Sequence, residues 1–102
     1  FLELFKTHSQ SLNSYWRYPL YLKKGSRKKL QEIFSEKYKI RITWMYEPLC
    51  HQQPVFRSYS RSKLPEAEKS IKKLINLPTH YGVTTIDAKR ISKYLKNEIM
   101  NL

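Results

Sequence analysis

The densest group of residues able to bind a ligand is a basic cluster around the start of a predicted helix. It consists of Lys23, Lys24, Arg27, Lys28 and Lys29. Ser26 suits the N-cap, which puts the last three in the first helical turn, where the helix dipole is already positive. Cations there cost about a few tenths of a kcal/mol each unless an anion binds. Two interpretations stay open: an anion-binding site at Arg27, Lys28 and Lys29, or a solvated face of a basic protein.

Residues that could act as nucleophiles or metal ligands are few. The single cysteine, Cys50, adjoins His51, but neighbours in a strand or loop usually point apart, which favours an ordinary loop cysteine over a nucleophilic pair. The three histidines, His8, His51 and His80, are far apart and lack metal-ligand spacing. Two glycines cannot build a phosphate-binding glycine loop. We therefore predict no catalytic residue and no metal site within this chain alone.

The charge balance favours an anionic partner. Twenty Lys and Arg residues against eight Asp and Glu give a net charge of +12, which suits nucleic acid, acidic surfaces or phosphorylated small molecules. Aromatic and basic residues interleave over residues 15–24, as in a platform that stacks single-stranded bases. Aromatics at strand spacing are more often core residues. A freestanding basic nucleic-acid-binding module is thus the alternative function.

Length and composition indicate one small globular domain. The chain has 102 residues, of which 40% are hydrophobic and 14% aromatic, too few for a complete two-domain enzyme. One cysteine suits a reducing cytoplasm, and no apolar run approaches the roughly 18 residues of a membrane span. The chain begins at Phe1 without an initiator methionine. We expect a cytoplasmic domain, without membrane contact, cut from a longer polypeptide.

The first half of the chain shows two helical and two strand patterns. Residues 1–7 are predicted to be the tail of a helix, followed by a polar turn. Residues 15–22 favour a strand, and Pro19 predicts that it is an edge strand or a strand with a bulge. From Ser26 a helix is predicted, with one apolar face formed by Leu30, Ile33, Phe34 and Tyr38. Residues 40–46 alternate apolar and polar and give the clearest strand signal.

The second half opens with a long connection and continues with two helices. Residues 47–64 contain two prolines and little periodicity, and loops of that length are often functional. Pro65 suits the first turn of a helix that runs to about residue 75, and a brief strand follows at 76–78. Thr84 and Asp87 form a capping-box pattern before a closing helix. Together these elements predict an α+β fold, with helices packed on a small, mostly antiparallel sheet.

Three ordered stretches resemble the C-terminal domain of the DegT/DnrJ/EryC1/StrS family of sugar aminotransferases, over residues 14–98. The first is Trp16-Arg17-Tyr18-Pro19-Leu20-Tyr21. The second runs from Tyr46-Glu47-Pro48-Leu49-Cys50-His51 to Gln52-Gln53-Pro54-Val55-Phe56. The third is Leu64-Pro65 with Ala67-Glu68, then Leu77-Pro78-Thr79-His80-Tyr81-Gly82-Val83-Thr84.

The resemblance implies the small C-terminal domain of a fold-type-I, pyridoxal-phosphate-dependent aminotransferase. Residues 1–13 would be the tail of an inter-domain helix and a turn, and residues 14–102 the domain itself. The cofactor and the lysine that binds it would belong to a large N-terminal domain absent from this chain. The fragment alone would then be inactive and hold no cofactor.

The resemblance also implies partners and site residues. Relatives are usually homodimers that move an amino group from glutamate or glutamine to a nucleotide-linked keto sugar. Tyr46 and His51 match the loop that approaches the substrate side of the cleft, where histidine could bond a sugar hydroxyl or a phosphate. Structural packing of His51 within its loop is the other interpretation. Glu47 and Cys50 depart from the family pattern, which usually has a proline and an aliphatic residue there.

Overall fold

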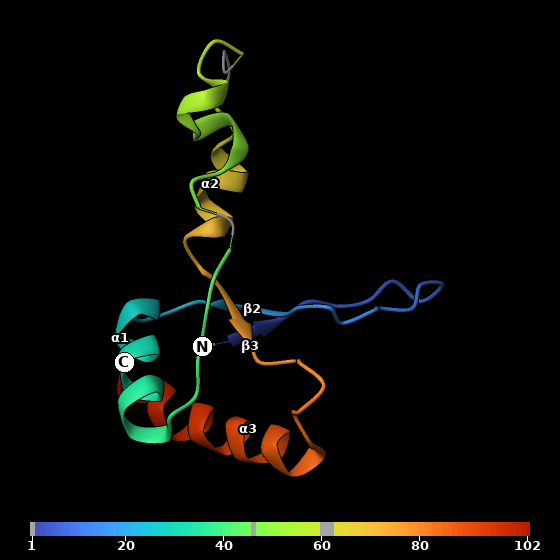
Figure 1. Ribbon diagram of the computed structural model, residues 1–102, viewed down its shortest axis with the longest axis vertical. Coiled ribbons are helices and arrows are strands. Elements are labelled where there is room, and N and C mark those ends of the chain that lie inside the picture. Colours follow the sequence, from blue (N-terminus) through green and yellow to red (C-terminus); the bar gives the residue numbers. More distant parts are fainter. Residues whose placement is uncertain (1, 46, 60–62) are drawn as a thin grey trace.

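The computed structural model describes residues 2–45, 47–59 and 63–102. Its strands and α-helices are β1 (Leu2–Leu4), β2 (Tyr18–Leu22), α1 (Arg27–Ile33), α2 (Pro65–Ile71), β3 (Leu74–Leu77) and α3 (Thr85–Ile99). A π-helical turn, Phe34–Tyr38, continues α1, and short 3-10 turns lie at Cys50–Gln52 and Pro54–Phe56. Figure 1 shows the sheet in the middle, with α1 and α3 beside it and two extended segments that project from it.

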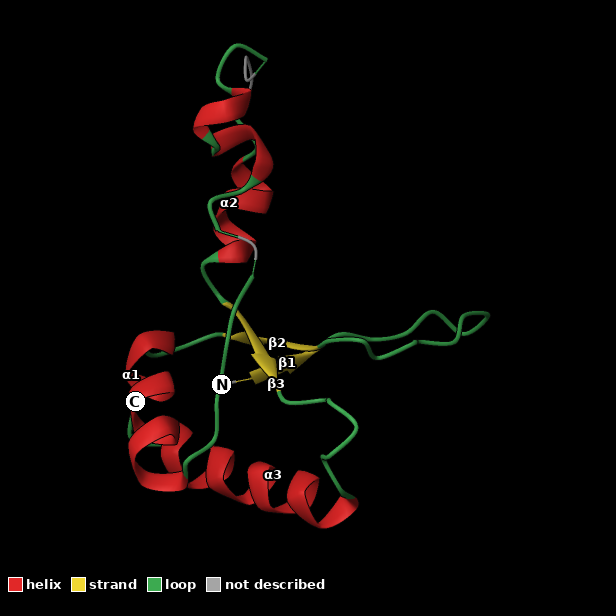
Figure 2. Ribbon diagram, viewed as in Figure 1, coloured by secondary structure: helices red, strands yellow, loops and turns green. Residues whose placement is uncertain are grey.

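The three strands form an antiparallel sheet in the order β1-β2-β3. Leu2 pairs with Leu22 at one side of β2, and Leu20 pairs with Ile75 of β3 at the other. The fold is therefore α+β with helices against a small antiparallel sheet, as predicted (Figure 2). Leu74 and Ile75, which the sequence assigned to the preceding helix, begin β3 instead.

The N-terminal segment contradicts the predicted helix tail, because Leu2–Leu4 is a strand. An apolar residue at every second position is compatible with either structure over so short a stretch. The segment lies next to the apolar β2, where Leu2 and Leu4 pair with Leu22 and Leu20. The strand pairing decides the conformation.

Pro19 lies in the central strand, which corrects the first of its two predicted positions, the edge strand. It stands opposite Asn76, whose backbone N–H and C=O both bond to Thr43 on the far side of β3. Pro19 is therefore in a non-hydrogen-bonded pair with β3, and its nitrogen faces the β1 side. The pairing with β1 stops at Leu20, opposite Leu4, and does not include Pro19. The missing N–H thus breaks no ladder bond.

The predicted strand over residues 40–46 is reduced to one bridge, between Thr43 and Asn76. In an antiparallel ladder the next bonded pairs would be Arg41 with Pro78 and Met45 with Leu74. Pro78 has no N–H to donate, and the carbonyl of Leu74 already accepts a bond from Arg27 Nη1 at 3.3 Å. The segment stays extended, and Ile42 is fully buried. Tyr46 lies outside the described residues.

One face of the sheet and three helical segments enclose the core. Leu30 and Phe34 come from α1 and its π-helical continuation, and their buried apolar face agrees with the prediction. The α3 side chains Ile91, Leu95 and Ile99 cover the same core. These side chains meet Leu20, Leu22, Ile42 and Ile75 of the sheet and the extended segment.

Helix ends are capped where the sequence places them. The Ser26 hydroxyl accepts a bond from the backbone N–H of Lys29, at 3.2 Å. The Thr84 hydroxyl accepts from the backbone N–H of Asp87, whose carboxylate accepts from the backbone N–H of Thr84 at 3.0 Å. Both the predicted N-cap and the predicted capping box are therefore confirmed.

Two segments extend from this core. We call residues 47–73 the arm; it carries both 3-10 turns and α2 and rises at the top of Figure 1. None of its described residues is buried. The other segment, the loop of residues 5–17, projects sideways and exposes Leu12 almost completely.

Candidate functional site

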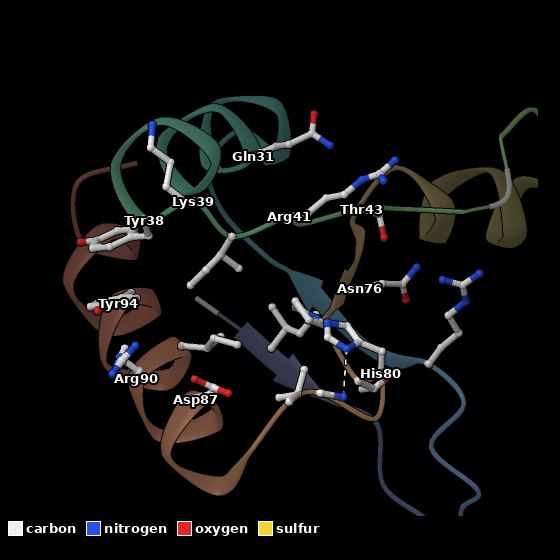
Figure 3. A pocket seen from close by; sticks show the side chains of 18 of the residues that line it. Gln31, Tyr38, Lys39, Arg41, Thr43, Asn76, His80, Asp87, Arg90 and Tyr94 are labelled. Atoms are coloured by element: carbon white, nitrogen blue, oxygen red, sulfur yellow. Dashed lines mark hydrogen bonds between the residues drawn. The ribbon is translucent and has the colours of Figure 1, made fainter.

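A groove of about 1060 Å³ lies between α3, the extended residues 39–45 and the loop that follows β3. Figure 3 shows Thr43 and Asn76 on the sheet side, Asp87, Arg90 and Tyr94 on α3, and His80 between them. Its lining mixes aromatic rings with cations and amides, so the groove suits a polar ligand more than a purely apolar one.

Cations outnumber acids around the groove. Arg17, Lys39, Arg41 and Arg90 line it, against the single acid Asp87 among the described lining residues. The two bonds from the Thr84 N–H and hydroxyl hold the pKa of Asp87 below its usual value. The groove therefore presents net positive charge, while its carboxylate is engaged in the α3 cap.

Several of the aromatic rings that line the groove contact other side chains of the protein. The rings of Tyr38 and Tyr94 stack at 3.9 Å between centroids. Trp44 is covered on one side by the Arg27 guanidinium, whose carbon lies 4.4 Å from the ring centre. Trp16 remains 67% exposed, with the Arg17 guanidinium 4.7 Å from its ring centre.

Arg27, one of the residues assigned to an anion site, has a set of protein partners. Its Nη1 donates to the carbonyls of Ile71, at 2.6 Å, and Leu74, at 3.3 Å. Its Nη2 pairs with the Glu47 carboxylate at 2.7 Å. The side chain is 15% exposed and connects α1 to both ends of the arm. This gives Arg27 a structural role that sequence spacing did not reveal.

Lys28 and Lys29 are exposed and lie on the seven-residue helix α1. An anion site at Lys28 and Lys29 stays a prediction.

His51 lies in the 3-10 turn Cys50–Gln52 of the arm and contacts α2. Its Nε2 is 2.8 Å from Glu68 Oε1, and Gln52 Nε2 donates to the same oxygen at 3.3 Å. The His51 contact is the main cause that lowers the pKa of Glu68. The ring is 16% exposed, so the histidine fixes the loop against α2.

Other candidate groups are placed as follows. Tyr46, the second substrate-side candidate, lies outside the described residues. Cys50 is exposed and forms no disulfide. His80 Nδ1 accepts the Gly82 N–H at 3.2 Å, which closes the turn after β3. Within the described part of the chain no three His, Cys, Asp or Glu side chains gather as metal ligands.

Sequence reasoning missed the groove residues Asn76 and Arg41. Asn76 interrupts the otherwise apolar strand Leu74–Leu77, and a polar residue within a short buried strand was the available signal. Arg41 alternates with Ile42 and Thr43, but its position beside β3 depends on the Thr43 bridge. Such a long-range pairing is not visible in local periodicity.

Fold and groove define a small α+β domain with a groove lined by basic and aromatic side chains. The chain belongs to the DegT/DnrJ/EryC1/StrS aminotransferase family, whose model matches residues 2–96. This confirms the family resemblance of the three motifs. Comparisons with curated proteins and with solved structures give no match. Among the described helices, none is long and apolar enough to cross a bilayer.

Proposed function

We propose that this chain is the small C-terminal domain of a fold-type-I, pyridoxal-phosphate-dependent aminotransferase. The family match over residues 2–96 carries the proposal. Residues 14–102 would form the domain, and residues 1–13 the connection to a large cofactor-binding domain. The parent enzyme would be a cytoplasmic homodimer that moves an amino group from glutamate or glutamine to a nucleotide-linked keto sugar.

The lysines of the chain support a cofactor site elsewhere. Pyridoxal phosphate, when bound, supplies an electron sink at the reacting carbon, and it is attached through a lysine amine. Such a lysine needs a depressed pKa from burial or a neighbouring cation. Every lysine of this chain is exposed. These residues do not fit the cofactor's attachment, which agrees with a lysine in the large domain.

The substrate-side candidates would be Tyr46 and His51, of which His51 lies in the arm. Contact with Glu68 occupies His51 Nε2 and leaves Nδ1 for a ligand hydroxyl or phosphate oxygen. None of the described residues of the arm is buried, which suits a segment that is completed by another polypeptide surface.

An absorbance measurement on the protein together with its natural preceding sequence tests the proposed activity. We expect a cofactor band at about 415 nm that moves to about 330 nm when glutamate is added. No band after addition of pyridoxal phosphate would contradict the proposal. In the active protein, His51→Ala should reduce sugar turnover more than cofactor binding, whereas His8→Ala should change neither. Unchanged turnover in His51→Ala would remove the substrate-side role.

A further inference from the structure

Asn76 carries a side-chain amide that bonds to no other group in the described part of the chain. The residue is 5% exposed, and its backbone groups bond to Thr43 at 2.7 and 3.2 Å. Its side chain lines the groove, beside Thr43 in Figure 3. The amide lines the groove without a protein partner, so a ligand that supplies a donor and an acceptor can bond to it.

A second unpartnered donor belongs to Arg17. Its Nε is buried without a hydrogen-bond partner among the described residues, and the residue lines the same groove. Arg41 lies two residues before Thr43 in an extended segment, so both face the same side as Asn76. Two arginines near one amide suit an oxyanion, which guanidinium groups bind through paired N–H donors.

The third feature is a stacking surface. Trp16 lines the groove, is 67% exposed and carries the Arg17 guanidinium over its ring. Indole and guanidinium planes are the surfaces on which proteins stack nucleobases. An asparagine amide has the donor and acceptor spacing that pairs with the edge of adenine.

We propose that this groove binds an adenine nucleoside phosphate, with the base stacked at Trp16, its edge at Asn76 and the phosphate at Arg17 and Arg41. The volume of about 1060 Å³ leaves room for a mononucleotide. Among described residues the lining comes from the core and the loop before β2, not from the arm that holds His51. The site is therefore separate from the substrate-side candidate His51 and does not rest on the aminotransferase proposal.

Nuclear magnetic resonance of the isotope-labelled 102-residue protein tests this with adenosine monophosphate as the probe. We expect the side-chain amide signals of Asn76 to shift on titration. Asn76→Leu should weaken binding at least about tenfold and keep the fold, because it replaces an unpartnered amide with an apolar group of similar size. The control Asn97→Leu, on the exposed side of α3, should bind as the wild type does. An Asn76 signal that stays in place at saturation would overturn the proposal.

Two comparisons, one of ligands and one of arginine variants, distinguish a specific nucleotide site from general attraction of anions to a basic protein. Adenosine and inorganic phosphate should each bind at least about tenfold more weakly than adenosine monophosphate. Arg17→Met should weaken nucleotide binding, while Arg57→Met, which removes the same charge from the arm, should not. Equal losses in the two variants, or phosphate binding as tight as nucleotide binding, would leave only nonspecific charge and reject the site.

Discussion

The core and the arm are stabilised in different ways. In the core, nine apolar side chains from the sheet, α1, α3 and the intervening segments are buried together. In the arm, none of the described residues is buried, and contacts are polar: His51 with Glu68, Gln52 with Glu68, and Gln53 with the Pro48 carbonyl. The core is therefore stabilised mainly by the hydrophobic effect, and the arm by a few hydrogen bonds.

This difference suggests that the core and the arm have different roles. A packed core fixes the positions of its side chains, as in the groove around Asn76. The arm exposes apolar side chains such as Val55, Phe56 and Tyr59. Arg27 is the link between the two regions, because it bonds to Glu47 at the start of the arm and to Ile71 near its end.

Truncation of one phenylalanine in the core and one in the arm should give the largest difference in the free energy of unfolding. Phe34 is fully buried in the core, so Phe34→Ala should lower the free energy of unfolding by about 3–5 kcal/mol. Phe56 is 45% exposed in the arm, and Phe56→Ala should change it by less than about 0.5 kcal/mol. Urea denaturation followed by circular dichroism measures both. Similar losses for the two variants would mean that the arm shares the core.

A backbone change at the edge of the core should have the next largest effect. Gly25 joins β2 to α1 with φ of +89°, and an added Cβ would lie 2.7 Å from Leu102 Cβ. Gly25→Ala should therefore lower the free energy of unfolding by about 1–3 kcal/mol. Gly82→Ala is the control, since Gly82 has no positive φ and its added Cβ would meet the His80 ring at the longer distance of 3.2 Å. Equal melting temperatures for the two variants would contradict the assignment of Gly25 to a tightly packed turn.

Acid sensitivity of the core should depend on Glu98. Bonds from the Lys37 ammonium and the Tyr38 hydroxyl hold the pKa of Glu98 below its ordinary value of 4.5. The folded protein thus binds the proton more weakly than the unfolded chain, so this stabilisation is present above pH 4.5 and is lost as the pH falls through the folded pKa. Glu98→Gln should flatten the acid limb of stability against pH, whereas exposed Glu36→Gln should not. An unchanged acid limb in Glu98→Gln would place the acid sensitivity elsewhere.

The core could be predicted better than the contacts between distant segments. Helical spacing identified Leu30, Phe34, Ile91 and Leu95, because a helix face is set by local periodicity. The strand expected at residues 40–46 failed for reasons that lie elsewhere in the chain: Pro78 lacks an N–H, and Arg27 takes the Leu74 carbonyl. Neither effect can be read from the alternation of the segment itself.

The candidate site shows the same limit. Cys50 and His51 were recognisable as loop residues, and the family motif pointed to His51. The partner Glu68 lies 17 residues further on, and its choice depends on how α2 folds back along the loop. Arg27 suited an anion site by spacing, yet Glu47 and two backbone carbonyls surround it. Local sequence indicates residue types that can bind, whereas tertiary pairing decides which of them stay available.

The smallest expected effect concerns the polar contacts of the arm. Glu68→Gln weakens the bond to His51 Nε2, so hydrogen exchange should accelerate over residues 50–56, while the urea midpoint of the whole chain should stay unchanged. Because the His51 bond lowers the pKa of Glu68, acidification below pH 4.5 should produce the same local opening in the wild type. The neighbouring exposed Glu66→Gln is the control. If Glu68→Gln shifts the global midpoint as Phe34→Ala does, the arm and the core unfold as one unit, and their contrast disappears.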